Sequence, residues 1–314
     1  MRESLSDNEN SWMKRFSVGI AIDTTLSDFE EMLIKYGKYI DNFYGSLPLG
    51  DYFHGRTHIM KQFHDPQNVS KFWEIVKLIN KYGVNFELVF NTENLSKEDF
   101  YLSQDELCKH KVSVDKIVIL DKYYEQVHAM FPNVKFVNSV NDMPNTLEDL
   151  KNKSYIYDEI VMGRQFIRSA EAFRIVTEEL GADCVLLVNN GCSHICGGCK
   201  SFDYCKSSYE KEKNKTSAEY LYALQSILPY EIIEKYFDTS MVKLFKLSTR
   251  NADTEFICKC LDSYINDNGK EYVDKSRHHY LMWSRLMWHQ DYFDYFDYER
   301  IRVIKQKICS EIEK

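Results

Sequence analysis

Short apolar runs recur along the chain, and each is separated from the next by a longer segment with helical periodicity. The first run, Phe16–Ile22, alternates with the period of two that is typical of a strand. Seven further runs rich in apolar residues predict strands at 39–44, 84–90, 116–120, 134–137, 158–162, 184–188 and 242–247. The intervening segments predict helices at 27–36, 69–82, 96–110, 122–130, 144–152, 168–180, 216–227 and 252–265.

Eight strands that alternate with helices predict an α/β protein with a parallel sheet, and we expect a (β/α)8 TIM-like barrel. The predicted barrel domain covers 16–268, which is close to the ~250 residues typical of this fold. An open, doubly wound sheet is the alternative, but no Gly-x-Gly-x-x-Gly turn follows the first strand. We expect 1–15 to be a polar tail and 269–314, dense in aromatic residues, to be a helical C-terminal extension packed on the barrel.

The composition is that of a folded protein, with 44% hydrophobic and 28% charged residues. The formal net charge of −8 argues against general nucleic-acid binding, because phosphate affinity depends largely on Lys and Arg. No apolar run approaches the ~20 residues of a membrane helix, and the polar residues 1–10 lack the apolar core of a secretory signal. We therefore expect a cytoplasmic protein whose cysteines are thiols or metal ligands rather than disulfides.

A cluster of four cysteines directly follows the seventh predicted strand. Thiolates are soft ligands that suit an iron–sulfur cluster or zinc. Four unpaired thiols on one exposed loop would be prone to oxidation, which argues against a loop without metal. We expect a 4Fe–4S cluster, with a structural zinc on the same thiolates as the alternative. The four ligands would be Cys192, Cys196, Cys199 and Cys205.

Two variations of this ligand set are open. The first three cysteines alone match the spacing of radical S-adenosylmethionine enzymes, which leaves one iron free to bind the cofactor. Against this, the loop follows the seventh strand instead of the first, and the residue before the third cysteine is Gly198 rather than an aromatic residue. Alternatively, Cys258 or Cys260, which follow the eighth strand, could replace Cys205 as the fourth ligand.

Polar residues follow several predicted strands at the end where barrel enzymes carry their active sites. Arg164 follows the sixth strand, and Lys246 and Arg250 lie at the end of the eighth. These cations could hold a carboxylate or a phosphate, so we predict an anion-binding site beside the cysteine loop. Three further predicted substrate contacts are Asn91 after the third strand, Asn189 after the seventh and Arg56 on the loop after the second.

Several segments resemble those of peptidase family U32, the collagenase-like peptidases. The resemblance extends to the order and spacing of the segments, over roughly 40–265, and it implies a barrel of the kind predicted above. The segments are Tyr44-Gly45, Phe86–Asn91, Tyr157–Arg164, Val188-Asn-Asn-Gly-Cys192 with Cys196, and Phe245–Arg250.

The resemblance also implies a function. Members of the family include enzymes or partners in the oxygen-independent hydroxylation of ubiquinone precursors and of RNA bases, and several hold a 4Fe–4S cluster on four cysteines. We therefore expect an iron–sulfur enzyme or enzyme subunit that acts on a small anionic molecule or a modified polymer. Asn190 replaces the Glu of the family's Asn-Glu-Gly-Cys motif, Thr249 replaces a Gly, and the cysteine spacing is tighter. These departures indicate a divergent branch with its own substrate.

Two other functions are compatible with the sequence. A zinc-stabilised scaffold without catalysis would bind a protein partner through the aromatic-rich region 280–298, because Tyr and Trp suit interfaces. A peptidase, as the family name suggests, would need an activated nucleophile or an open zinc position, and four thiolates would fill that position.

Overall fold

The structure is a computed structural model of the chain. It describes residues 16–49, 61–139, 146–153, 156–162, 166, 170–190, 226–227, 242–247 and 253–265. The predicted tail and C-terminal extension lie outside these residues, as do the predicted domain boundaries. The same holds for Arg56, Arg164, Arg250 and the four cysteines of the loop.

Eight parallel strands close into a barrel, with each strand hydrogen-bonded to its neighbours in chain order and the last strand pairing with the first. The predicted (β/α)8 TIM-like barrel is therefore confirmed. The strands are β1 (Phe16–Gly19), β2 (Ile40–Gly45), β3 (Asn85–Val89), β4 (Lys116–Ile119), β5 (Lys135–Asn138), β6 (Glu159–Val161), β7 (Asp183–Leu187) and β10 (Val242–Lys246).

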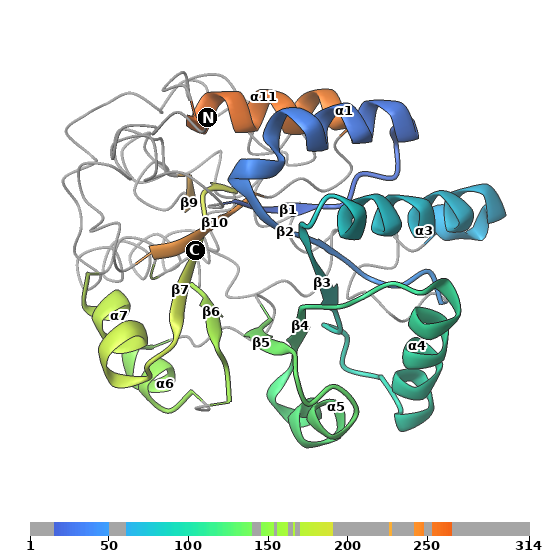
Figure 1. Cartoon of the computed structure of the whole chain (residues 1–314). Coiled ribbons are helices and arrows are strands. Elements are labelled where there is room, and N and C mark those ends of the chain that lie inside the picture. The colour runs from blue at the N-terminus through green and yellow to red at the C-terminus, as the bar shows by residue number, and fades with distance from the viewer. Residues whose placement is uncertain are drawn as a thin grey trace, which may run out of the picture.

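Helices surround the strands on the outside of the barrel (Figure 1). Within the described residues they are α1 (Leu26–Tyr36), α3 (Pro66–Lys81), α4 (Lys97–His110), α5 (Tyr124–Met130), α6 (Leu147–Lys151), α7 (Ala170–Arg174) and α11 (Thr254–Ile265). Short helical turns extend or precede some of them: η2 (Gly37–Tyr39), η3 (Lys61–His64), η4 (Asp121–Tyr123) and the π-helical η5 (Ile175–Glu179).

Side-chain caps fix where several helices begin. The Thr25 hydroxyl accepts the Asp28 N–H and starts α1, while the Asp65 carboxylate accepts the Gln67 N–H at the start of α3. Ser96 forms a capping box with Asp99 at the start of α4. Such caps satisfy backbone N–H groups that have no partner inside the helix, so the polar residues between the strands set the helix boundaries.

One predicted helix, 216–227, is wrong at its C-terminal end. Ser226–Ile227 is a short strand, β9, which pairs antiparallel with β8 (Asn189–Asn190) directly after β7. The apolar pattern of this segment fits a helix, but pairing with a distant strand overrides local preference. The segment 191–225, which carries all four cysteines of the loop, therefore starts and ends at one small two-stranded sheet.

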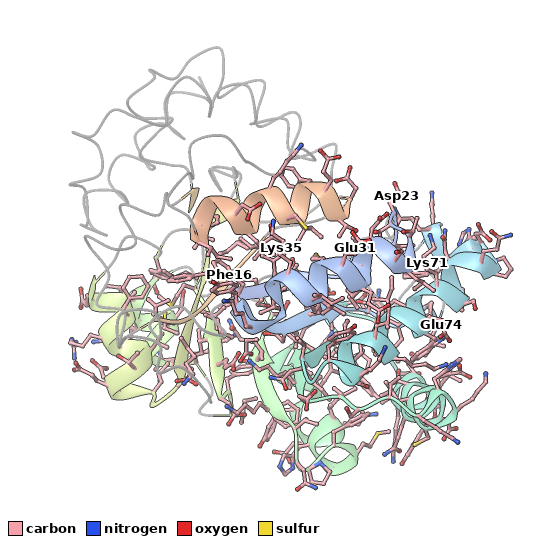
Figure 2. The ribbon with its side chains drawn as sticks, turned by 45° about the horizontal axis from the view of Figure 1, so that its top comes forward. Phe16, Asp23, Glu31, Lys35, Lys71 and Glu74 are labelled. Atoms are coloured by element: carbon pink, nitrogen blue, oxygen red, sulfur yellow. The ribbon has the colours of Figure 1, made fainter. Side chains whose placement is uncertain are left out.

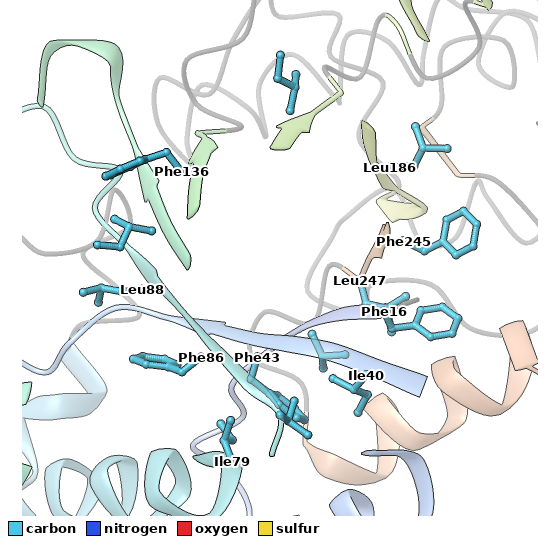
Figure 3. Packing of buried hydrophobic residues seen from close by; sticks show 14 of the residues in the cluster. Phe16, Ile40, Phe43, Ile79, Phe86, Leu88, Phe136, Leu186, Phe245 and Leu247 are labelled. Atoms are coloured by element: carbon cyan, nitrogen blue, oxygen red, sulfur yellow. The ribbon is translucent and has the colours of Figure 1, made fainter. Parts of the chain in front are cut away.

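The main core lies between the outer face of the strands and the helices. Phe43, Phe86 and Phe245 are among its fully or almost fully buried members, and Figure 3 shows them projecting from their strands. The Phe86 ring packs edge-on against Phe72 of α3, with 6.2 Å between centroids. Aromatic pairs of this kind add to the hydrophobic gain of burial, so they fasten the helices to the barrel.

A second, smaller apolar cluster fills part of the barrel interior. Its members come from six neighbouring strands, one residue from each, and their side chains point to the same side of the sheet. Tyr44 packs against them. Side chains two residues apart on a strand point to the same side, so this cluster identifies which positions face inward. The members are Val89, Val118, Val137, Val161, Val185 and Leu244.

The described helices include none that is both long enough and apolar enough to cross a membrane.

We expect Phe86→Ala to destabilise the protein strongly, because it removes a ring that is 0% exposed between β3 and α3. Large-to-small changes at such sites cost about 3–5 kcal/mol in the free energy of unfolding. Urea denaturation checks this, with Tyr101→Ala as the control: Tyr101 is 48% exposed, and its removal should change stability by no more than about 0.5 kcal/mol. Equal losses in the two variants would contradict the assignment of Phe86 to the core.

Candidate functional site

Charged and polar side chains occupy much of the barrel interior. Glu87, Lys116 and Glu159 each precede a valine of the interior cluster by two residues, and Lys246 follows Leu244 by two. They therefore point inward, and all four residues are buried. Barrels of this type are usually filled by branched apolar side chains. A charged interior is thus the distinguishing feature of this barrel.

Lys246 lies at the C-terminal end of β10, which is the end of the barrel where such proteins carry their sites. Its Cα pairs with that of Leu187, the last residue of β7, so it stands beside the strand that leads into the cysteine-containing segment. The prediction that Lys246 is at a strand end is confirmed. Its role as a substrate contact stays a prediction.

The Lys246 ammonium crosses the interior to the opposite wall of the barrel. Its Nζ donates to Glu87 Oε1 on β3 at 2.6 Å, and it lies 4.3 Å from the centroid of the Tyr44 ring on β2. A carboxylate and an aromatic face both favour a buried cation. An ammonium has three N–H donors, and Glu87 takes one of them.

Tyr44 lies near the C-terminal end of β2, beside Lys246. Its hydroxyl donates to the Leu247 carbonyl at 2.7 Å, although β1 lies between β2 and β10. The β1 residue whose Cα pairs with Tyr44 is Gly19. Because glycine has no side chain, the Tyr44 ring can reach across β1 to the neighbouring strand. Tyr44 thus holds both the Lys246 ammonium and the end of β10.

Asn42 connects Glu87 to the first strand. The Asn42 Nδ2 group donates to Ser17 Oγ at 2.9 Å and to Glu87 Oε2 at 3.0 Å. Both Glu87 oxygens therefore accept hydrogen bonds, one from Lys246 and one from Asn42. A buried carboxylate with both oxygens satisfied is held in one orientation, so the position of Lys246 is fixed as well.

A second charged group lies toward the N-terminal ends of the strands. Lys116 Nζ donates to Glu159 Oε1 at 2.6 Å and to Asp41 Oδ2 at 2.7 Å. The register between β1 and β2 shifts at Asp41, since Phe16 pairs with Ile40 and Ser17 pairs with Asn42. Such a bulge changes the direction in which a side chain points, here that of Asp41. The Asp41 side chain is 20% exposed, so it connects this group to solvent.

Burial and neighbouring charges shift two pKa values in this second group. Burial raises the pKa of Glu159; Lys116 opposes this shift, while the carboxylates of Glu87 and Asp41 add to it. Burial alone would lower the pKa of Lys116, but the carboxylates of Glu159 and Asp41 outweigh burial and raise it. Lys116 is therefore held as an ammonium, and Glu159 binds its proton more tightly than an exposed Glu does.

The other predicted contacts of the substrate are only partly described. Asn91 lies two residues after the end of β3 and is half-buried. Asn189 belongs to β8, where it pairs with Ile227, and only its backbone is described. The structure therefore brings Asn189 next to the end of β7, one strand away from Lys246. Arg56, Arg164 and Arg250 lie outside the described residues.

The cysteines outside the loop do not gather at one point among the described residues. Cys184 and Cys260 are buried, Cys258 is half-buried and Cys108 is exposed on α4. Burial raises the pKa of the Cys184 thiol well above its usual range and that of the Cys258 thiol to about 11. In the part of the chain that the structure describes, no group of three or more His, Cys, Asp or Glu side chains could hold a metal ion.

A groove with a volume of about 570 Å³ lies on the outside of the barrel between α1 and α11. Figure 2 labels Asp23, Glu31 and Lys35 along the α1 side of this groove. Cys258 lines it, and Lys35 pairs with Asp262 at 3.6 Å. Its charged groups face solvent, where pairing is weak, so the barrel interior is the stronger candidate site.

Sequence reasoning missed four interior residues: Asn42, Glu87, Lys116 and Glu159. A signal for three of them is present, because a charged residue interrupts an apolar strand at the phase that should face the interior. Glu87 stands between Phe86 and Leu88, for example. The sequence alone does not indicate which charges meet inside the barrel.

The fold and the interior define a (β/α)8 barrel protein with a charged core and a candidate site at the C-terminal ends of its strands. A scan against protein-family models found no match. A search of the curated proteins also found no match.

Solved structures with similar barrels have low sequence identity to this chain. The U32 peptidase Mk0906 is 15% identical, with 79% of this chain and 95% of that chain covered and a TM-score of 0.43. A mutant tryptophan synthase alpha-subunit from the hyperthermophile Pyrococcus furiosus is 11% identical, with 96% and 99% covered and a TM-score of 0.40. The HpcH/HpaI aldolase from Desulfitobacterium hafniense DCB-2 is 7% identical, with 85% and 96% covered and a TM-score of 0.39. At these values the similarities assign neither a family nor an activity.

We expect Glu87→Leu and Lys246→Met each to destabilise the protein by about 3–5 kcal/mol, because each leaves one buried charge without its partner. The double variant should cost clearly less than the sum of the two single variants, since it removes both charges together. Urea denaturation of all four proteins forms a double-mutant cycle. The exposed pair Glu74–Lys77 serves as the control and should show a coupling of no more than about 1 kcal/mol. Additive losses for Glu87 and Lys246 would contradict the pairing.

Proposed function

We propose that the protein is an iron–sulfur enzyme, or the catalytic subunit of one, that acts on a small anionic or modified substrate at the C-terminal mouth of its barrel. Cys192, Cys196, Cys199 and Cys205 bind a 4Fe–4S cluster. Lys246 contacts the substrate, together with the predicted contacts Arg56, Asn91, Arg164, Asn189 and Arg250.

One observation carries the proposal: the segment with the four cysteines starts and ends beside Lys246. Its two ends, β8 and β9, pair with each other directly after β7. In the barrel, β7 is the hydrogen-bonded neighbour of β10, which ends at Lys246. The two ends of the cysteine-containing segment and a buried cation thus lie toward the same end of the barrel, where chemistry in this fold gathers.

The donor set fits an iron–sulfur cluster. Four cysteines within one short segment supply the all-thiolate environment that such clusters use. The other described cysteines fit less well, because a metal ligand must be a thiolate. Burial keeps the Cys184 and Cys258 thiols protonated by raising their pKa values, and Cys260 is part of the main core. These placements favour Cys205 over Cys258 or Cys260 as the fourth ligand.

The residues of the chain have separate tasks in this proposal. Glu87 and Tyr44 hold the Lys246 ammonium at the mouth. Among the described residues only Glu87 accepts from Lys246, so the other N–H donors can bind a carboxylate or phosphate oxygen. When bound, the cluster would supply electron transfer. The resemblance to peptidase family U32 suggests oxygen-independent hydroxylation as the class of reaction.

Two alternatives lead to different expectations. Zinc in place of the cluster would give a metal-stabilised scaffold, with the aromatic-rich region 280–298 as the surface for a protein partner.

A peptidase would need a nucleophile beside a general base. The interior network contains carboxylates, ammonium groups, an amide and the Ser17 hydroxyl. Ser17 Oγ accepts from Asn42, and among the described residues it donates to no general base, so the described interior favours anion binding over peptide cleavage.

Anaerobic purification should give a brown protein with about four irons per chain, as a 4Fe–4S cluster requires. Replacing Cys192, Cys196, Cys199 or Cys205 by Ser should reduce the iron content and the visible absorption. Metal analysis with optical and EPR spectra measures both.

Cys108→Ser is the matched control, because Cys108 is exposed on α4, and it should retain all of its iron. A colourless protein that binds one zinc per chain would overturn the proposal in favour of the scaffold. If Cys205→Ser retains its iron and Cys258→Ser or Cys260→Ser loses it, Cys258 or Cys260 is the fourth ligand in place of Cys205.

A further inference from the structure

The interior network contains one more carboxylate than it has ammonium groups. Its anionic candidates are Asp41, Glu87 and Glu159, and its cations are Lys116 and Lys246. Glu87, Glu159 and both lysines are at least nine-tenths buried, so bulk solvent and counterions screen their charges weakly. An unpaired charge at such a site is costly, and a buried group avoids the cost by becoming neutral.

The hydrogen bonds identify which buried carboxylate has an oxygen without a described partner. Glu87 accepts at both oxygens, from Lys246 and from Asn42. Glu159 accepts from Lys116 at Oε1, but its buried Oε2 has no hydrogen-bond partner among the described residues. Asn42 Oδ1 is a second buried acceptor of the same network that lacks a described partner.

We propose that Glu159 is a proton-binding site inside the barrel: it carries a proton on Oε2 near neutral pH, so that Glu87 remains the carboxylate that holds Lys246 as an ammonium at the mouth. The proton converts Oε2 from an acceptor into a donor, and it brings the interior to two carboxylates and two ammonium groups. Only the link to substrate binding by Lys246 depends on the function proposed above.

The charged groups near Glu159 among the described residues come from several strands, and Lys135 on β5, which is exposed, is one of them. Lys116 on β4 favours the ionised form, whereas Glu87 on β3 and Asp41 at the bulge of β2 disfavour it. Asp183 on β7, whose Cα pairs with that of Glu159, is half-buried and is not among the groups that shift the Glu159 pKa. Lys246 lies beyond Glu87 and is already paired. Lys116 is also shared with Asp41, so its charge does not neutralise Glu159 alone.

Solvent reaches the network at one described member. The Asp41 side chain is 20% exposed, while the side chains of Lys116 and Glu159 are 5% and 2% exposed. Asp41 is connected to Glu159 through the Lys116 ammonium. A proton can therefore exchange with water from the N-terminal end of the barrel, away from the cysteine loop. Glu159 acts on Lys246 through Glu87, which makes it a positioning residue rather than a group that touches substrate.

Glu159→Gln is the decisive variant, because the Gln amide reproduces a neutral carboxyl with one acceptor and one donor side. We expect its urea midpoint near pH 7 to lie as close to that of the wild type as the midpoint of the exposed control Glu74→Gln does. Glu87→Gln should lower the midpoint markedly, because it neutralises the carboxylate that holds Lys246. A loss for Glu159→Gln equal to that for Glu87→Gln would overturn the proposal.

The pH dependence of stability provides a second readout. At pH values above the ordinary Glu pKa of 4.5, the folded protein still holds the Glu159 proton, whereas the unfolded chain releases it. The unfolded state then binds fewer protons than the folded state, so stability falls as the pH rises from that value through the raised pKa of Glu159. Glu159→Gln should lack this part of the slope. A slope that is identical in wild type and Glu159→Gln would overturn the proposal.

The proton can also be observed directly in the wild type. Infrared spectra of the wild type near pH 7 should contain a protonated-carboxyl band, and carbon-13 NMR of Glu-labelled protein should show one Glu that titrates late. Both signals should be absent from Glu159→Gln and present in Glu74→Gln. If the band is present but the iron test fails, only the proposed function falls. If iron is bound and no Glu carries a proton, only the inference about Glu159 falls.

Discussion

The closed barrel removes its inward-facing side chains from water, and the charges inside it must therefore find partners on other strands. Lys246 on β10 meets Glu87 on β3, and Lys116 on β4 meets Glu159 on β6 and Asp41 on β2. None of these pairs joins neighbouring strands. Each forms only when the walls of the barrel face one another, so the free energy of these buried hydrogen bonds and charge pairs is coupled to closure of the sheet.

The same constraint makes the mouth a specific site rather than a patch of polar residues. A lysine in water samples many orientations, but Lys246 is held by a carboxylate whose other oxygen is held by Asn42 and by a ring that is fastened to the Leu247 carbonyl. Groups positioned before a ligand arrives lose little entropy when it binds. The outer groove between α1 and α11 has more carboxylates, but its exposed pairs cannot provide comparable positioning.

The sequence predicted the barrel because its strands and helices differ in period, and it predicted that Lys246 ends a strand. The sequence pattern could not predict the pairing of Lys246 with Glu87, because 159 residues separate the two and only the closed sheet brings them together. The bulge that aims Asp41 at Lys116 has no local signal either. Strand β9 was predicted as part of a helix, because its pairing with β8 depends on tertiary contact rather than on pattern.

The stability of the fold does not by itself explain why the barrel interior is charged. Well-packed apolar residues in place of buried ion pairs are often neutral or stabilising, and apolar side chains fill most barrels of this kind. The network divides into two halves with different positions. Lys246 and Glu87 stand toward the end from which the cysteine segment leaves, whereas Lys116 and Asp41 stand toward the opposite, solvent-connected end. Glu159 belongs to the second half, but its charge state acts on the first through Glu87. A proton on Glu159 would remove the repulsion between Glu159 and Glu87, so the second half supports the carboxylate that positions the ammonium at the mouth.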